Sequence, residues 1–106
     1  MAQQLEKDTA VQTTYETYAQ KFKALSDPKR LELLNLIGLK KSVCVCDLVE
    51  EMAMPQSKLS YHLKILLTAG FLTKETKGTW SYYALDDKEL GRLLPEGLYN
   101  SISTRN

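Results

Sequence analysis

Histidine and cysteine are scarce in this chain, and their scarcity limits its chemistry. The 106 residues include one histidine, His62, and two cysteines, Cys44 and Cys46. A single histidine excludes a multi-histidine metal site and most catalytic triads, whose base is a histidine. His62 precedes the apolar Leu63, so we expect a packed, hydrogen-bonded histidine rather than a ligand. With no glycine-rich phosphate loop and no HExxH motif, the sequence favours a protein that is not an enzyme.

Long apolar runs are also missing. No stretch approaches the roughly 18–20 apolar residues of a membrane span, and the first ten residues, MAQQLEKDTA, have no signal-peptide core. We therefore expect a cytoplasmic protein with no membrane partner. Cysteines in that compartment are normally reduced, so Cys44 and Cys46 are expected to be thiols rather than a structural disulfide.

Net charge is low overall, at +1, but it is unevenly distributed. Residues 52–83 carry one acidic side chain, Glu75, against four lysines: Lys58, Lys64, Lys74 and Lys77. Because the positive charge lies in one block, this block is where an anionic partner is expected to bind.

The length fits a single domain with a thin core. We expect disorder over residues 1–10, one folded domain over residues 11–100 and a tail over residues 101–106. The domain opens with an apolar stripe at helical spacing: Val11, Tyr15, Tyr18, Phe22 and Leu25. Such a stripe packs either on its own domain or on a second subunit.

Helix signals follow this stripe. Ser26-Asp27-Pro28 starts a second helix, expected to end near Gly38. A short helix over residues 47–52 comes next, and Pro55 starts a fourth helix that runs to about Gly70.

Beyond Gly70 the pattern changes to that of two strands, residues 71–76 and 79–85, joined around Lys77-Gly78. One last helix is expected, with Leu90, Leu93, Leu94 and Leu98 along its apolar face. This order predicts a mainly α fold with a β-hairpin, the winged helix-turn-helix.

The fourth helix is the candidate DNA-reading element. Between Gln56 and Ala69 it has no acidic residue, and its polar face offers the amide, hydroxyl and ammonium groups that bind base edges and phosphates. The expected DNA-binding residues are Gln56, Ser57, Lys58, Ser60, Tyr61 and Lys64, with Lys74 and Lys77 on the wing. The alternative is an ordinary solvated face.

Cys44 and Cys46 form the second candidate site, although two buried apolar cysteines are an alternative. Residues i and i+2 of an α-helix point about 200° apart, whereas on extended chain they share a face. A soft ion bound by both thiolates brings their sulfurs within roughly 4 Å of each other. Such an ion must therefore find residues 44–46 unwound or unwind them.

These residues resemble the arsenical-resistance repressor (ArsR) family of winged-helix proteins. The matching segments are ALSDPKRL at 24–31, CVCDL at 44–48, QSKLSYHLKILL at 56–67 and the wing end at 82–85. CVCDL is typical of the branch that senses arsenite and antimonite. The resemblance implies a homodimer that binds double-stranded operator DNA of an arsenic-resistance operon and is released by As(III) or Sb(III).

The resemblance also implies residue roles. Cys44 and Cys46 are the metalloid ligands, while Val49 stands where some relatives have a third cysteine. The third ligand is then a small thiol, a solvent oxygen or nothing. The first and last helices form the dimer interface, through Val11, Tyr15, Tyr18, Phe22, Leu90, Leu94 and Leu98.

The mechanism expected from these two sites is that the ion unwinds the first turn of the third helix and so shifts the reading helix. Two regulatory alternatives remain: a cadmium, lead or redox sensor that uses the same thiols, and a constitutive DNA-binding module with inert cysteines. A small thiol oxidoreductase is a third alternative, but the chain lacks CxxC and a βαβ pattern.

Overall fold

The computed structural model describes the backbone of residues 2–103 and the side chains of residues 13–102. Its elements are α1 (Ala2–Ala24), α2 (Pro28–Lys40), β1 (Val43–Cys44), α3 (Val45–Met52), α4 (Gln56–Thr68), β2 (Leu72–Lys77), β3 (Trp80–Leu85), α5 (Asp87–Leu93) and α6 (Glu96–Ser103). This order confirms the winged helix-turn-helix. The disorder expected over residues 1–10 stays a prediction.

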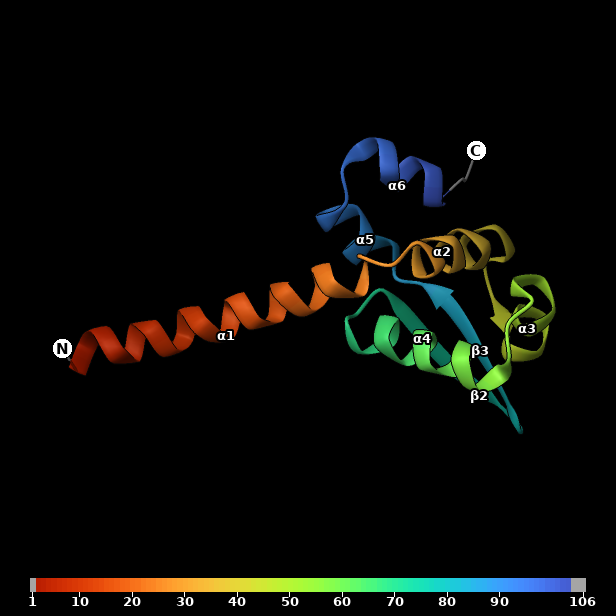
Figure 1. Cartoon of the computed structure of the whole chain (residues 1–106), viewed down its shortest axis with the longest axis horizontal. Helices are drawn as coiled ribbons and strands as arrows, with labels where there is room; N and C mark the ends of the chain where they lie inside the picture. The colour runs from red at the N-terminus through yellow and green to blue at the C-terminus, as the bar shows by residue number, and fades with distance from the viewer. Residues whose placement is uncertain (1, 104–106) are drawn as a thin grey trace.

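Helix α1 projects from the body of the domain as a long arm, with the N-terminus at its far end (Figure 1). Its last turn packs on the core through Ala24, which is fully buried. The Nζ atom of Lys21 donates a hydrogen bond of 2.5 Å to the carbonyl oxygen of Ala69 and lies 2.9 Å from the carboxylate of Glu89. Lys21 thus attaches α1 both to the end of α4 and to α5.

Helix α2 begins where the capping signal places it. The carboxylate of Asp27 accepts a hydrogen bond of 2.7 Å from the backbone N–H of Lys29, which is the main cause that lowers the pKa of Asp27. The helix does not end near Gly38 as expected but continues to Lys40. Lys41 ends it with a φ of 70°, a left-handed conformation that glycine adopts more readily.

The wing is a three-stranded antiparallel sheet rather than a simple hairpin. Its strand order is β1-β3-β2, and Val43 pairs with Tyr83. Gly78 has a φ of 65°, as a two-residue hairpin loop requires of its first residue. Strand β1 was not expected, because two residues are too short to show an alternating pattern.

The single last helix expected from the leucine spacing is wrong: the chain forms two helices, α5 and α6. The break falls at Leu94, whose φ of −90° and ψ of 144° are extended. Pro95 disfavours helical backbone in the residue before it and cannot continue the hydrogen-bond ladder. The break lets α6 pack against α2, where Ile102 is buried.

The core lies between α2, α3, α4, the start of the sheet and α5. Its largest fully buried side chains are Leu33, Leu34, Ile37, Leu48, Leu59, Leu63, Leu66, Phe71 and Leu90. The apolar face of α4 is therefore inside, and its polar face is left outside.

A buried Arg30–His62 pair also fixes the position of α4. Nε and Nη2 of Arg30 donate to the carbonyl oxygens of Ala24 (2.8 Å) and Lys23 (3.3 Å) at the end of α1. Nη1 of Arg30 lies 3.0 Å from Nδ1 of His62 on α4. Because a guanidinium only donates, His62 accepts at Nδ1 and is neutral. The packing expected of this histidine is confirmed, and its hydrogen bonding is confirmed at Nδ1. Within the described part of the chain, its buried Nε2 has no hydrogen-bond partner.

Burial is the main cause that lowers the pKa of His62 below 6.5, and the positive charges of Arg30 and Lys58 add to it while Asp27 opposes them. The folded state thus favours neutral His62, and this stabilisation is complete above pH 6.5 and lost as the pH falls below it. We expect the free energy of unfolding to decrease as the pH falls below 6.5. The contribution of His62 to this decrease is at most about 1.4 kcal/mol per pH unit.

Urea unfolding of the wild type and of His62→Asn between pH 8 and pH 5 tests this expectation. The asparagine carbonyl keeps an acceptor near the position of Nδ1 but does not titrate, so the variant should have a smaller pH slope. Identical slopes in the two proteins would show that His62 does not carry the pH dependence.

Candidate functional site

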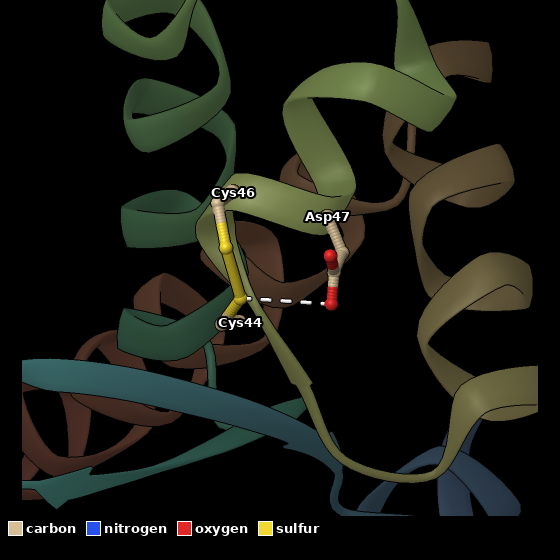
Figure 2. A group of neighbouring side chains, drawn as sticks. All are labelled: Cys44, Cys46 and Asp47. Carbon is tan, nitrogen blue, oxygen red and sulfur yellow. Dashed lines mark hydrogen bonds between the residues drawn. A yellow bond between two sulfur atoms is a disulfide. The ribbon is translucent and has the colours of Figure 1, made fainter.

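Cys44 and Cys46 lie at the junction of β1 and α3, with their sulfur atoms in contact (Figure 2). Cys44 ends β1 and is the N-cap of α3, with an extended φ of −89° and ψ of 161°. Cys46 is the second residue of α3, and the two Cα atoms are 5.5 Å apart. Because the helix starts between the two residues, both side chains reach the same side of the backbone.

This arrangement corrects the expected unwinding. A helix through residues 44–46 would separate the sulfurs, but α3 begins at Val45 and leaves Cys44 extended. The sulfurs therefore meet without any loss of helix. Of the two possibilities left by the sequence, the structure shows the segment already unwound at its first cysteine.

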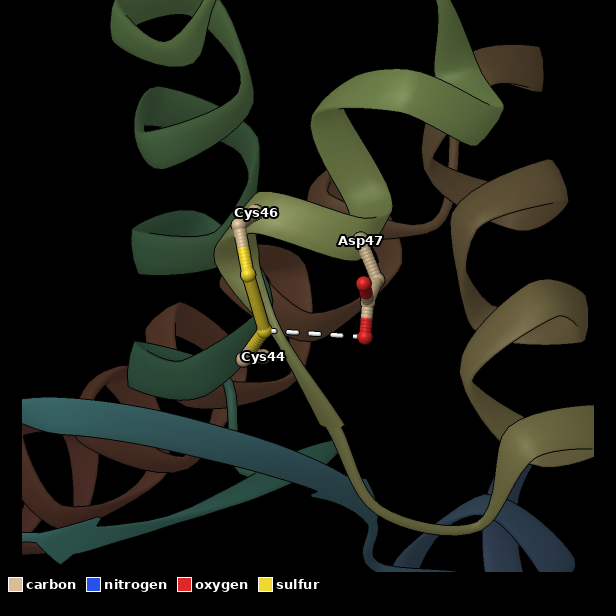
Figure 3. Close-up of a disulfide and its surroundings, with 3 residues drawn as sticks. All are labelled: Cys44, Cys46 and Asp47. Carbon is tan, nitrogen blue, oxygen red and sulfur yellow. Dashed lines mark hydrogen bonds between the residues drawn. A yellow bond between two sulfur atoms is a disulfide. The ribbon is translucent and has the colours of Figure 1, made fainter.

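The expectation of free thiols also differs from the structure. The sulfurs of Cys44 and Cys46 are joined as a disulfide (Figure 3). Within the described residues no free cysteine remains. Reduction of this bond gives two thiols that face each other.

Asp47 completes the cluster. Its Oδ2 lies 3.6 Å from Sγ of Cys44, and one ligand atom from each of Cys44, Cys46 and Asp47 lies within 4.8 Å of the others. In the reduced protein, the Cys44 thiol can donate to this carboxylate. Asp47 is not among the ligands expected from the sequence, although its position three residues after Cys44 at a helix start is a usable signal.

The cluster is open on one side. Cys44 is buried at 8% exposure, whereas Cys46 and Asp47 are exposed. The N-terminus of α3 favours negative charge, so it stabilises thiolates at its first turn. Val49 is half-buried against the core and offers no donor atom. Together these residues provide a solvent-accessible site with two sulfur donors and one oxygen donor.

The site connects the wing to the helix-turn-helix. Cys44 pairs with Tyr82 in β3, the central strand of the wing sheet. Helix α3, which carries Cys46 and Asp47, packs against α4. A ligand held by both cysteines would therefore bridge the two parts of the domain expected to contact DNA.

The polar face of α4 is exposed, as the sequence predicts. All six of its candidate DNA-binding residues are exposed: Gln56, Ser57, Lys58, Ser60, Tyr61 and Lys64. On β2, Lys74 and Lys77 are also exposed, and their ammonium groups lie 6.0 and 5.5 Å from the rings of Tyr83 and Tyr82. An exposed polar helix face and a cationic wing thus lie on one domain.

The candidate dimer residues are in different environments. Tyr15 and Phe22 on α1 are 65% and 55% exposed, and Leu98 on α6 is 36% exposed. Tyr18 and Leu94 are half-buried, and the side chain of Val11 lies outside the described residues.

Leu90 requires a correction. It is fully buried in the core of its own chain, so it has no surface to give to a partner. Apolar spacing alone cannot distinguish a core position from an interface position, because both need the same residue type.

Among the described residues, no helix is long and apolar enough to cross a bilayer.

Comparison with known proteins agrees with this architecture. Residues 27–74 match the model of the family described as "Bacterial regulatory protein, arsR family". The arsenical resistance operon repressor of Bacillus subtilis is 60% identical over 81 residues, which are 76% of this chain and 77% of the relative. A cadmium resistance regulatory protein CadC homolog of Staphylococcus aureus is 33% identical over 83% of this chain and 72% of its own length.

A solved structure from Mycobacterium bovis is also similar. It is a homodimeric winged helix-turn-helix DNA-binding domain, described as a possible ArsR-family transcriptional regulator. The TM-score is 0.68 at 25% identity, over 76% of this chain and 74% of that one. With the family match and the 60% identical relative, this similarity shows that the chain belongs to the arsR family of bacterial regulatory proteins.

Proposed function

We propose that this protein is a transcriptional repressor of an arsenic-resistance operon. A homodimer binds double-stranded operator DNA in the cytoplasm, and As(III) or Sb(III) bound to Cys44 and Cys46 releases it. The observation that carries the proposal is the contact between these two sulfurs at the junction of β1 and α3. The 60% identity to an arsenical resistance operon repressor supports the metalloid as inducer, and we propose no catalytic role.

The donor set fits a thiophilic metalloid. Thiolates are the ligands of soft ions, and two of them face each other here once the disulfide is reduced. The Asp47 carboxylate, with Oδ2 3.6 Å from Sγ of Cys44, adds one oxygen donor beside the two sulfurs. A cadmium- or lead-sensing role is less well supported, because the similarity to the cadmium regulator is 33% against 60% for the arsenical repressor.

The site's position suggests how binding would affect DNA affinity. Cys44 belongs to the wing sheet through its pairing with Tyr82, and Cys46 belongs to α3, which packs on the reading helix α4. Holding both sulfurs on one ion fixes the wing relative to α3 and α4. A dimer must place two reading helices about 34 Å apart. A small change in the orientation of the wing relative to α3 and α4 would therefore misalign both half-sites. A coupling of about 1–3 kcal/mol would weaken binding roughly 5- to 150-fold.

Operator titration with and without arsenite, in reducing buffer, tests the ligands. The wild type should lose affinity by the factor just given, while Cys44→Ser and Cys46→Ser should bind operator but respond weakly, because a hydroxyl is a poor ligand for a soft ion. Ser42→Ala, an exposed neighbour of the site, is the matched control and should respond like the wild type. Equal release of all four proteins by arsenite would refute the assignment.

The reading face makes a separate prediction. Lys64→Ala removes a phosphate contact, so affinity should fall for all sequences and the dependence on salt should flatten. Gln56→Ala removes a base contact and should relax discrimination at one base step by about 1–3 kcal/mol. Fluorescence-anisotropy titrations on the operator and on single-base variants measure both effects. If neither variant changes binding, α4 is not the reading helix.

Exposed aromatic residues on α1 support the dimer. Tyr15 and Phe22 lie on the projecting arm, and the similar M. bovis domain is homodimeric. Phe22→Glu should raise the dimer dissociation constant at least about tenfold, because burying an aromatic side chain contributes roughly 1.5–3 kcal/mol.

Leu39→Glu is the matched control for this prediction, since Leu39 is an equally exposed apolar residue (56%) on α2. Sedimentation equilibrium of both variants measures the dissociation constant. Equal dimerisation of Phe22→Glu and the wild type would remove α1 from the interface.

A further inference from the structure

A cleft lies between the last turns of α1 and the outer side of α4. Its volume is about 490 Å³, and its polar lining comes from Gln20 and Lys23 on α1, Arg30 on α2, and Tyr61, Lys64 and Thr68 on α4. The remaining lining residues are Ala24 and Ile65. We refer to this feature as the α1–α4 cleft.

The lining of the cleft carries positive charge only. Lys23, Arg30 and Lys64 contribute three cations, and no aspartate or glutamate is among the lining residues. Lys23 and Lys64 are exposed and have flexible side chains, whereas Arg30 is 8% exposed and held in place. The cleft therefore combines two mobile cations with one fixed one.

Arg30 is partnered within its own chain. Its hydrogen bonds go to the neutral carbonyl oxygens of Lys23 and Ala24 and to the neutral ring of His62. Arg30 also forms an ion pair of 3.7 Å with Asp27. The net positive charge of the lining therefore comes from Lys23 and Lys64, and it attracts an anion.

The cleft continues the reading face. Tyr61 and Lys64 line the cleft and also belong to the exposed polar face of α4. Lys23 is separate from the apolar face of α1, because it follows Phe22 and successive helix residues point about 100° apart. An anion in the cleft would therefore touch the DNA-facing side of the domain without displacing the proposed dimer contact.

We infer that the α1–α4 cleft binds a backbone phosphate of the operator duplex, with Lys23 and Lys64 on either side of it. This inference rests on the proposed function and extends the DNA interface from the reading helix and wing onto α1. The helix that carries the exposed dimer residues would then also contact the duplex directly.

Salt-dependent titration of duplex DNA tests the inference with Lys23→Gln, which removes the charge but leaves the backbone carbonyl that Arg30 uses. The slope of log K against log salt should become less steep, by at most about 0.9, because Lys64 still faces the same phosphate. Affinity should fall by the same factor on operator and scrambled duplex, because a phosphate contact carries no sequence information. Lys23→Arg should restore the wild-type slope.

Lys41→Gln is the matched control. Lys41 is an exposed lysine at the opposite end of α2 from Arg30, outside the cleft. The Lys41→Gln variant should bind DNA with the wild-type slope of log K against log salt.

A wild-type slope in Lys23→Gln, with normal DNA binding by the wild type, would overturn the inference and leave the proposed function intact. Loss of affinity in Lys23→Gln on the operator alone would also overturn it, because that result assigns Lys23 to a base. A wild type that binds no duplex DNA would overturn both.

Discussion

The start of α3 between its two cysteines is the constraint on which the proposed switch depends. Had the helix begun one turn earlier, Cys44 and Cys46 would point to opposite sides and no single ion could join them. The extended backbone of Cys44 is in turn held by β1, which pairs with β3. The geometry of the thiol site therefore depends on the wing sheet as much as on the helix. A shift of the sheet relative to α3 would change the distance between the two sulfurs.

Helix α4, the proposed reading helix, is held by a small number of specific contacts. Its inner face packs Leu59, Leu63 and Leu66 into the core, and His62 joins it to the end of α1 through Arg30. A second attachment runs from Lys21 on α1 to the carbonyl oxygen of Ala69, just beyond α4. Helix α1 also presents the exposed aromatic residues of the proposed dimer. In that dimer, these contacts would set the position of one α4 helix relative to the other through α1.

Much of this organisation could be predicted from the sequence, and the exceptions have physical reasons. The capping signal at Asp27-Pro28, the apolar face of α4 and the hairpin at Gly78 are local patterns, and the structure follows them. Strand β1 depends on a partner about forty residues away, which no local pattern shows. The break before Pro95 was missed because the leucine spacing continues across it, and Leu90 was assigned to an interface because a core position has the same apolar character.

In the proposed switch, both sulfurs bind one metalloid while α3 keeps its helix from Val45 onward. Backbone NMR of the reduced protein with and without arsenite, together with arsenic-edge X-ray absorption, distinguishes this arrangement from an unwound helix. We predict helical chemical shifts over Val45–Met52 in both states, with two sulfur atoms bound to the arsenic. Loss of helical shifts in the first turn of α3 on binding, with both sulfurs attached, would show instead that the metalloid unwinds the start of this helix.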